Sequence, residues 1–150
     1  MFTVKNASKK NLETVSEIEK VSHARPWALS AFECELSKSL SGASLFLCAV
    51  TADNDETAGY LTGDWIVDYL HISNIAVKPD FRGKGCAKAL LGRAVQETFK
   101  KRFGAITLEV RENNEAAVSL YKKAGFIVKG IRPKFYEDKY DGLLLWKTLL

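Results

Sequence analysis

The loop RGKGCAK, residues 82–88, places two glycines and three basic side chains between a strand-like run and an amphipathic helix pattern. Unpaired backbone N–H groups converge where a helix begins, and the helix dipole favours negative charge there. Glycines also let the backbone approach phosphate oxygens without a side-chain clash. We therefore predict an anion site, to which the following residues contribute: Arg82, Gly83, Lys84, Gly85 and Lys88.

The charge around this loop agrees with an anion site. Residues 78–102 carry eight Lys and Arg against two acidic residues, a local balance of +6 in a chain of net charge +4. A P-loop would need Ser or Thr directly after Gly-Lys, and a dinucleotide fingerprint would need glycine in place of Lys88. The phosphates of another small cofactor therefore fit better, and a turn that merely reverses the chain is the alternative.

Two residues further along the chain have side chains suited to proton transfer. Glu109 shares one face of the strand-like run ITLEVR with Thr107 and Arg111, so alternation predicts a half-exposed carboxylate. Tyr121 lies on the apolar face of a predicted helix, where the ring can be buried while the hydroxyl faces a polar cleft. The alternative for Glu109 is a surface ion pair with Arg111 or a lysine. The alternative for Tyr121 is a packed aromatic residue of the core.

The elements that must position these residues follow from hydrophobic periodicity, which switches several times between about 2 and 3.6 residues, as in a mixed α/β domain. Asp141 and Gly142 predict a turn before the last strand. The predicted order is βααβββαβαββ. Strands are expected near residues 2–6, 44–51, 58–67, 69–77, 105–110, 126–128 and 143–150, and helices near 12–23, 31–40, 87–95 and 115–124.

Polar residues that precede three of the helix patterns are predicted to cap them. Ser8 or Asn11 would cap the first helix, Ser30 the second and Asn114 the fourth, since such side chains accept hydrogen bonds from free N–H groups. Gly125 suits the left-handed position that ends a helix.

The loop resembles the Arg/Gln-x-x-Gly-x-Gly/Ala motif of the GCN5-related N-acetyltransferases, with Arg82 first, Gly85 fourth and Ala87 sixth. The segment LEVRENNEAAVSLYKKAGF, residues 108–126, resembles the later cofactor segment of that superfamily. The resemblance implies an α/β (α+β) GNAT fold over residues 1–150 as one N-acetyltransferase domain. A mixed central sheet would be flanked by about four helices, with two parallel central strands splayed apart around the cofactor acetyl-CoA.

The segments HARPW (residues 23–27) and NIAV (residues 74–77) resemble the RimI-type, ribosomal-protein alanine branch of the superfamily. For catalysis, the resemblance implies Glu109 as general base and Tyr121 as the acid that protonates the departing thiolate. Trp27 and Tyr136 would line a peptide slot, unless either belongs to the core. Implied cofactor contacts are Ile75, Ala76, Val77, Arg82, Gly83, Lys84, Gly85, Cys86, Ala87, Lys88, Asn114 and Tyr121.

Two other titratable side chains receive no catalytic role. Cys86 is predicted at a helix N-terminus, which would depress its thiol pKa and permit a covalent acetyl-cysteine route. Phosphate binding would crowd the thiol, and the resemblance implies direct transfer within a ternary complex. His71 lies alone in a β-meander, where a histidine is usually structural.

The branch resemblance implies that the acceptor is a protein N-terminus, with the N-terminal alanine of a ribosomal protein similar to bS18 as the expected substrate. An α-amine, with a pKa of about 7.7–8.0, is partly neutral at neutral pH, whereas lysine has a pKa of about 10.4. The sequence departs from the branch after Tyr136, because Asp141-Gly142 runs into an apolar segment where an acidic pair is typical. Lysine or small-amine acetylation, and a non-catalytic acyl-CoA- or RNA-binding module, are therefore alternatives.

Composition adds expectations about environment. The chain has 150 residues and three cysteines without a CxxC pair, which argues against a disulfide framework or a zinc site. Neither a signal peptide nor a membrane-spanning run is evident. We expect a cytoplasmic protein, a monomer or weak dimer, that binds no metal, nucleic acid or membrane.

Overall fold

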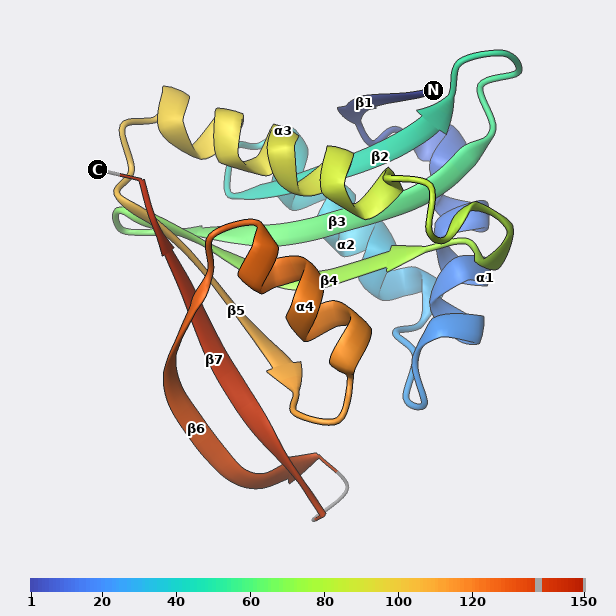
Figure 1. The fold of residues 1–150 in the computed structure, drawn as a ribbon. Coiled ribbons are helices and arrows are strands. Elements are labelled where there is room, and N and C mark those ends of the chain that lie inside the picture. Colours follow the sequence, from blue (N-terminus) through green and yellow to red (C-terminus); the bar gives the residue numbers. More distant parts are fainter. Residues whose placement is uncertain (137–138, 150) are drawn as a thin grey trace.

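A computed structural model describes residues 1–136 and 139–149 of the chain. Among these residues, seven strands form one sheet in the order β1-β2-β3-β4-β5-β7-β6 (Figure 1). The strands are β1 (Phe2–Asn6), β2 (Ser44–Thr51), β3 (Thr57–Ile66), β4 (Tyr69–Val77), β5 (Ala105–Arg111), β6 (Ile127–Tyr136) and β7 (Tyr140–Thr148). The α-helices are α1 (Leu12–Ser22), α2 (Leu29–Leu40), α3 (Cys86–Lys100) and α4 (Glu115–Lys123).

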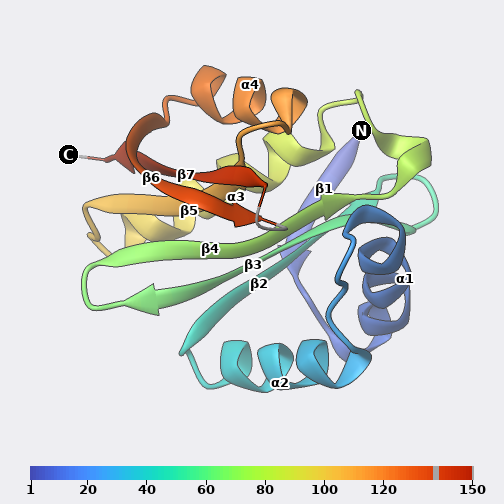
Figure 2. The ribbon, with the colours of Figure 1, turned by 90° about the horizontal axis from the view of Figure 1, so that it is seen from below.

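The helices cover both faces of the sheet, with α1 and α2 on one side and α3 and α4 on the other (Figure 2). The first face buries a cluster in which Val15 and Ile18 of α1 meet Phe32, Phe46 and Tyr60. The second face buries Leu90, Leu91 and Ala94 of α3 together with Tyr121 of α4. The predicted fold class and element order are confirmed, because amphipathic helices and alternating strands left a clear pattern in the sequence.

The predicted caps were correct for the fourth helix and wrong for the second. Asn114 Oδ1 accepts the backbone N–H of Ala117 at 3.2 Å, and Gly125 has a φ of +97° after α4. Helix α2 instead begins at Leu29, because the carbonyl of extended Ala28 already accepts the Ala31 N–H at 3.0 Å. Ser30 therefore lies inside the first turn of α2.

The start of the first helix also differs from the prediction in detail. Asn11 occupies the N-cap position of α1, but its side chain does not bond to the helix. Asn11 Oδ1 accepts the Ser8 backbone N–H at 2.9 Å, and Asn11 Nδ2 donates to Thr57 Oγ1 at 3.0 Å. A contact across 46 residues thus decides the direction of this side chain.

The predicted turn at Asp141 and Gly142 was wrong, because both residues lie within β7. Gly142 is paired with Arg111 of β5 on one side and with Arg132 of β6 on the other. Pairing to both neighbouring strands extends β7 beyond its apolar segment, so β7 already begins at Tyr140, which pairs with Tyr136 at the end of β6. Leu150, which was predicted in this strand, lies outside the described residues.

The parallel strands β4 and β5 separate part of the way along their length (Figure 1). Their register runs from Tyr69 opposite Ala105 to Ile72 opposite Leu108 and ends there, although each strand continues. Ser73 is an extra residue in β4, since the β3 residues Thr62 and Gly63 pair with Asn74 and Ile72. Because such a bulge bends its strand, the splay has a local cause, and the predicted splay is confirmed.

Gly59 of β3 provides a stability test of the face that α3 covers. A Cβ at this position would lie 2.9 Å from the Ala76 carbonyl oxygen and 3.0 Å from Cys86 Sγ. Gly59→Ala should therefore destabilise the protein by about 1–3 kcal/mol, as overpacking does, which urea unfolding would measure. Gly92→Ala in α3 is the control, because no atom lies within 4 Å and alanine is the better helix former. Equal stabilities of the two variants would contradict the packing.

Candidate active site

The two glycines of the loop before α3 both adopt left-handed backbone conformations. Gly83 has a φ of +74° and Gly85, the N-cap residue of α3, a φ of +86°. A Cβ at either position would meet no atom within 4 Å. Glycine is therefore required here by backbone conformation, and the space in front of the loop is open to a ligand.

The basic side chains of the loop differ in their environments. The Arg82 guanidinium donates to the Val77 carbonyl at 3.0 Å and to Ser22 Oγ at 3.2 Å, which links the loop to the end of α1. Lys84 Nζ donates to the Asp80 carbonyl at 3.1 Å. The loop is thus held on both sides while its helix N-terminus faces outward.

A cavity of about 540 Å³ lies in front of this loop, and we call it the cofactor-side cavity. It runs from the loop between β4 and α4, beyond the point where β4 and β5 separate. All but one of the predicted cofactor contacts line it, the exception being Lys84. The lining residues include Ile75, Ala76, Val77, Arg82, Gly83, Gly85, Cys86, Ala87, Lys88, Asn114 and Tyr121.

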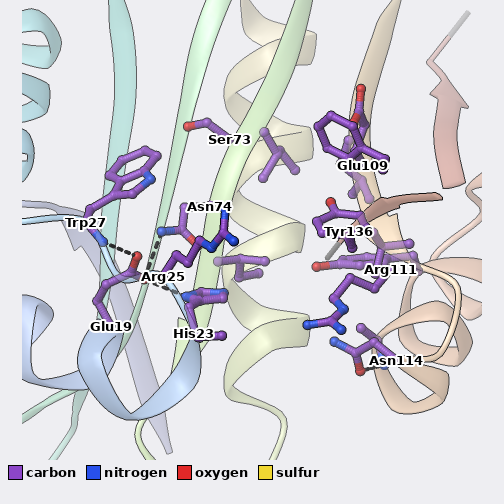
Figure 3. Close-up of a pocket in the computed structure, with 18 residues that line it drawn as sticks. Glu19, His23, Arg25, Trp27, Ser73, Asn74, Glu109, Arg111, Asn114 and Tyr136 are labelled. Carbon is purple, nitrogen blue, oxygen red and sulfur yellow. Dashed lines mark hydrogen bonds and ion pairs between the residues drawn. The ribbon is translucent and has the colours of Figure 1, made fainter. Parts of the chain in front are cut away.

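A second cavity of about 430 Å³, the acceptor-side cavity, lies on the other side of the splay. One wall comes from α1, the segment after it and β4, and the opposite wall comes from β5, α4 and β6 (Figure 3). Trp27 lies in the first wall, and Glu109 and Tyr136 lie in the second, so these three and Tyr121, the four predicted catalytic and substrate residues, all line the cavity. Asn74, for which no role was predicted, also lies in the first wall. The two cavities share His23, Ile75, Asn114, Ala117 and Tyr121.

Glu109 of β5 is one of the residues that line the acceptor-side cavity. Its side chain is 17% exposed, and Oε1 forms an ion pair with Arg132 Nη2 of β6 at 2.9 Å. The alternation of the strand predicted a half-exposed carboxylate, and the alternative interpretation was an ion pair of Glu109 with Arg111 or a lysine. The actual partner comes from another strand, so no local pattern in the sequence pointed to Arg132.

Tyr121 lies where the two cavities meet. Its side chain is 5% exposed, and its ring packs edge-on against Phe126 with centroids 5.9 Å apart. Burial, with a smaller contribution from Tyr136, raises the pKa of Tyr121 to about 12. Among the described residues its hydroxyl has no hydrogen-bond partner, so a protonated phenol is available to a bound ligand. A carboxylate and a phenol in adjoining cavities can accept and donate the protons that acyl transfer moves.

The predicted depression of the Cys86 pKa was wrong. Cys86 is 2% exposed, and burial raises the pKa of its thiol to about 11. Burial disfavours the charged thiolate, which accounts for the raised pKa. His71 Nδ1 lies 2.8 Å from Thr107 Oγ1, which ties the side chain to β5.

Trp27 and Tyr136 of the acceptor-side cavity each pack against a neighbouring side chain. The Trp27 ring packs against Phe32 at a centroid distance of 5.3 Å. The Arg111 guanidinium lies 5.6 Å from the centre of the Tyr136 ring, and Arg111 lines the cavity, a role that was not predicted from the sequence. Trp27 and Tyr136 thus contribute to both packing and the cavity wall.

Sequence reasoning also missed Glu19, a carboxylate that is 1% exposed at the base of the same cavity. Trp27 N–H donates to Oε2 at 2.9 Å, while Asn74 Nδ2 at 2.9 Å, His23 Nδ1 at 2.6 Å and the Tyr60 hydroxyl contact Oε1. Burial alone would raise the pKa of Glu19, but these hydrogen bonds lower it to about 2. A signal existed, because position 19 continues the apolar helix face four residues after Val15.

The family model "Acetyltransferase (GNAT) family" matches residues 12–126. A Bacillus subtilis relative, called a putative [ribosomal protein bS18]-alanine N-acetyltransferase, is 36% identical over 97% of this chain and 95% of its own. The structure of the Escherichia coli ribosomal-protein-S18-alanine N-acetyltransferase superposes with a TM-score of 0.88 at 28% identity, covering 99% of this chain and 94% of that one.

A phosphinothricin acetyltransferase from Sinorhizobium meliloti, solved with acetyl-CoA, shares the fold with a TM-score of 0.85 at 18% identity. The match covers 99% of this chain and 88% of that one. Within the residues that the structure describes, no helix combines the length and apolarity that crossing a membrane requires.

Proposed function

Because this chain belongs to the acetyltransferase (GNAT) family and is an N-acetyltransferase, we propose that it transfers acetyl from acetyl-CoA to the N-terminal alanine of ribosomal protein bS18. The observation that carries this proposal is the junction of the two cavities at Tyr121, with the helix-start loop in one and Glu109 in the other. The relatives named for the bS18 reaction support the choice of acceptor.

Acetyl-CoA, when bound, supplies the thioester. Backbone N–H groups at the start of α3 bind its pyrophosphate, since an anion is favoured at a helix N-terminus. Gly83 and Gly85 keep that approach open, and Arg82 and Lys88 add positive charge. Ile75, Ala76 and Val77 line the path toward the junction, where β4 and β5 no longer pair with each other in the described structure.

The residues at the junction divide the proton transfers of the reaction. Glu109 takes a proton from the attacking amine, directly or through a water, as the amine nitrogen bonds to the thioester carbonyl carbon. Tyr121 would donate its hydroxyl proton to the sulfur atom as the carbon–sulfur bond of the thioester breaks. The raised pKa of Tyr121 keeps its phenol protonated at neutral pH.

We place this activity in the cytoplasm, carried out by residues 1–150 as one domain that acts as a monomer or weak dimer. The acceptor is a protein N-terminus of small first residue rather than nucleic acid. Trp27 and Tyr136 would border the first residues of the peptide, because they lie in opposite walls of the acceptor-side cavity.

Thiol release from acetyl-CoA, measured across a panel of amines, tests the proposal. The panel contains a peptide with the bS18 amino terminus, the same peptide with a blocked α-amine, a lysine peptide, a polyamine and an aminoglycoside. We expect release only with the free amino-terminal peptide. Release confined to the polyamine or aminoglycoside would replace the proposed acceptor with a small amine.

Gly85→Ala tests the assignment of the loop to the cofactor. An alanine at a φ of +86° strains the loop by about 1–3 kcal/mol, so we expect weaker CoA binding by calorimetry. Gly42→Ala is a matched control, because Gly42 has a φ of +87°, equally open surroundings and a position far from the cavity, between α2 and β2. Both variants should lose stability, but only Gly85→Ala should lose CoA affinity. Equal CoA affinities would contradict the assignment.

A further inference from the structure

Asn74 lies in β4 just after the bulge, on the wall of the acceptor-side cavity that faces Glu109 (Figure 3). Its amide nitrogen donates to Glu19 Oε1 at 2.9 Å. Its amide oxygen has no hydrogen-bond partner among the residues that the structure describes. The mechanism proposed above uses neither Asn74 nor Glu19.

The carboxylate of Glu19 decides which way this amide points. An ionised carboxylate only accepts hydrogen bonds, whereas an asparagine amide has a nitrogen that donates and an oxygen that accepts. Glu19 stays ionised because its hydrogen bonds hold its pKa at about 2. The nitrogen of Asn74 must therefore face Glu19, and the oxygen must face away from it.

The other partners of Glu19 make this arrangement rigid. Tyr60 of β3 and the Trp27 backbone N–H hold the carboxylate from two further elements, so Glu19 cannot turn to release Asn74 without breaking both contacts. The Tyr60 side chain is fully buried. A hydrogen-bond acceptor is thus presented at a defined place in the cavity.

We propose that Asn74 Oδ1 is a substrate-binding acceptor that takes a hydrogen bond from an N–H at the amino end of the peptide, and that Glu19 is the positioning residue that orients it. This proposal rests on the proposed function. The N–H belongs either to the α-amine or to the first peptide bond. An acceptor on the wall opposite Glu109 would place the peptide end between the two walls and select substrates that carry an N–H there.

Asn74→Ala removes the acceptor and leaves the cofactor-side cavity intact. We expect KM for the bS18 amino-terminal peptide to rise about 3- to 10-fold, as loss of one neutral hydrogen bond implies, with kcat within about 2-fold. CoA affinity should not change. Asn54→Ala, in the exposed turn between β2 and β3, is the control and should leave both constants unchanged.

A peptide with an ester in place of its first amide separates the two possible donors. If the first peptide N–H is bound, wild type should lose about 3- to 10-fold in kcat/KM with the ester, and Asn74→Ala should lose nothing further. If the α-amine is bound, the variant's defect should be the same with ester and amide peptides. Either result supports an N–H contact at Asn74.

Glu19→Gln tests the positioning role. A glutamine can donate its own amide to Asn74 and let that amide turn, so a donor would face the peptide. We expect the peptide KM to rise as in Asn74→Ala, and the double variant to be no worse than the single ones. If Glu19→Gln does not fold, as a melting curve would show, the Asn74→Ala result decides.

The outcomes separate this inference from the proposed function. A wild-type protein that acetylates no amino-terminal peptide would overturn the proposed function itself. A wild type that acetylates the peptide, together with an unchanged KM in Asn74→Ala, would overturn only the role of Asn74. A matching loss of CoA affinity in Asn74→Ala would show a general packing defect and would likewise count against the hydrogen bond.

Discussion

Replacing Glu109 by glutamine is expected to lower kcat for acetylation of the bS18 amino-terminal peptide by about 10²- to 10⁴-fold, the usual contribution of a general base. Glutamine has nearly the same shape but cannot hold the proton that the amine loses. Stopped-flow or steady-state thiol release measures the rate. CoA affinity should remain unchanged, because Glu109 lines the acceptor-side cavity and not the cofactor-side one.

The loss of activity in Glu109→Gln should not come from unfolding. The ion-pair partner, Arg132, is 59% exposed, so the arginine remains hydrated when the carboxylate is removed and stability should change little. Glu112→Gln is the matched control, because this neighbouring residue does not line the cavity. Its carboxylate accepts a hydrogen bond from the Asp141 backbone N–H, with a nitrogen–oxygen distance of 3.3 Å. An unchanged rate in Glu109→Gln would reduce Glu109 to a structural partner of Arg132.

Replacing Tyr121 by phenylalanine is the second large effect that we expect, with a fall in kcat of about 10²-fold or more. The hydroxyl has no partner in the described part of the protein, so its removal breaks no internal hydrogen bond and the packed ring remains. Thiol release measures kcat. Calorimetry should find a CoA affinity within about 2-fold of wild type, because the hydroxyl is expected to act in the transition state and not in the binding of CoA.

The raised pKa of Tyr121 predicts the pH range over which its phenol can donate a proton. Because burial raises the pKa of Tyr121 to about 12, the phenol should stay protonated, and the wild-type rate should not fall from its ionisation below about pH 11. The control is Tyr69→Phe, whose ring stacks with Trp146 at 6.3 Å outside both cavities. Equal rates for Tyr121→Phe and wild type would show that Tyr121 is a packed core residue and not a proton donor.

Much of the fold could be predicted because it rests on contacts between residues close in sequence. Helix α4 shows this, since Asn114 caps it three residues before Ala117 and Gly125 ends it with a positive φ. The predictions that failed concern places where a distant partner decides. Strand β7 extends through Asp141 and Gly142 because β5 and β6 pair with it on both sides, which no turn propensity can indicate.

The site residues likewise separate into those that local sequence predicted and those that it did not. The loop before α3 could be predicted from Gly83 and Gly85, because left-handed backbone and a helix start are local properties. The resemblance to a family then supplied Glu109 and Tyr121, and the structure brings both to adjoining cavities. The acid–base roles of these two residues stay predictions until the variants are measured.

The sequence by itself determined the glycine-rich loop before α3, the strand alternation that places Glu109 on one face with Thr107 and Arg111, and the amphipathic helices that cover the sheet. Only the tertiary structure decided what surrounds the substrate. Glu19 forms hydrogen bonds with Tyr60, 41 residues away in sequence, and with Asn74, 55 residues away. These contacts hold the carboxylate of a helix residue in a buried position in the acceptor-side cavity. Charge, pKa and hydrogen-bond direction at such a site depend on which distant groups exclude water from it, and no local pattern in the chain records that.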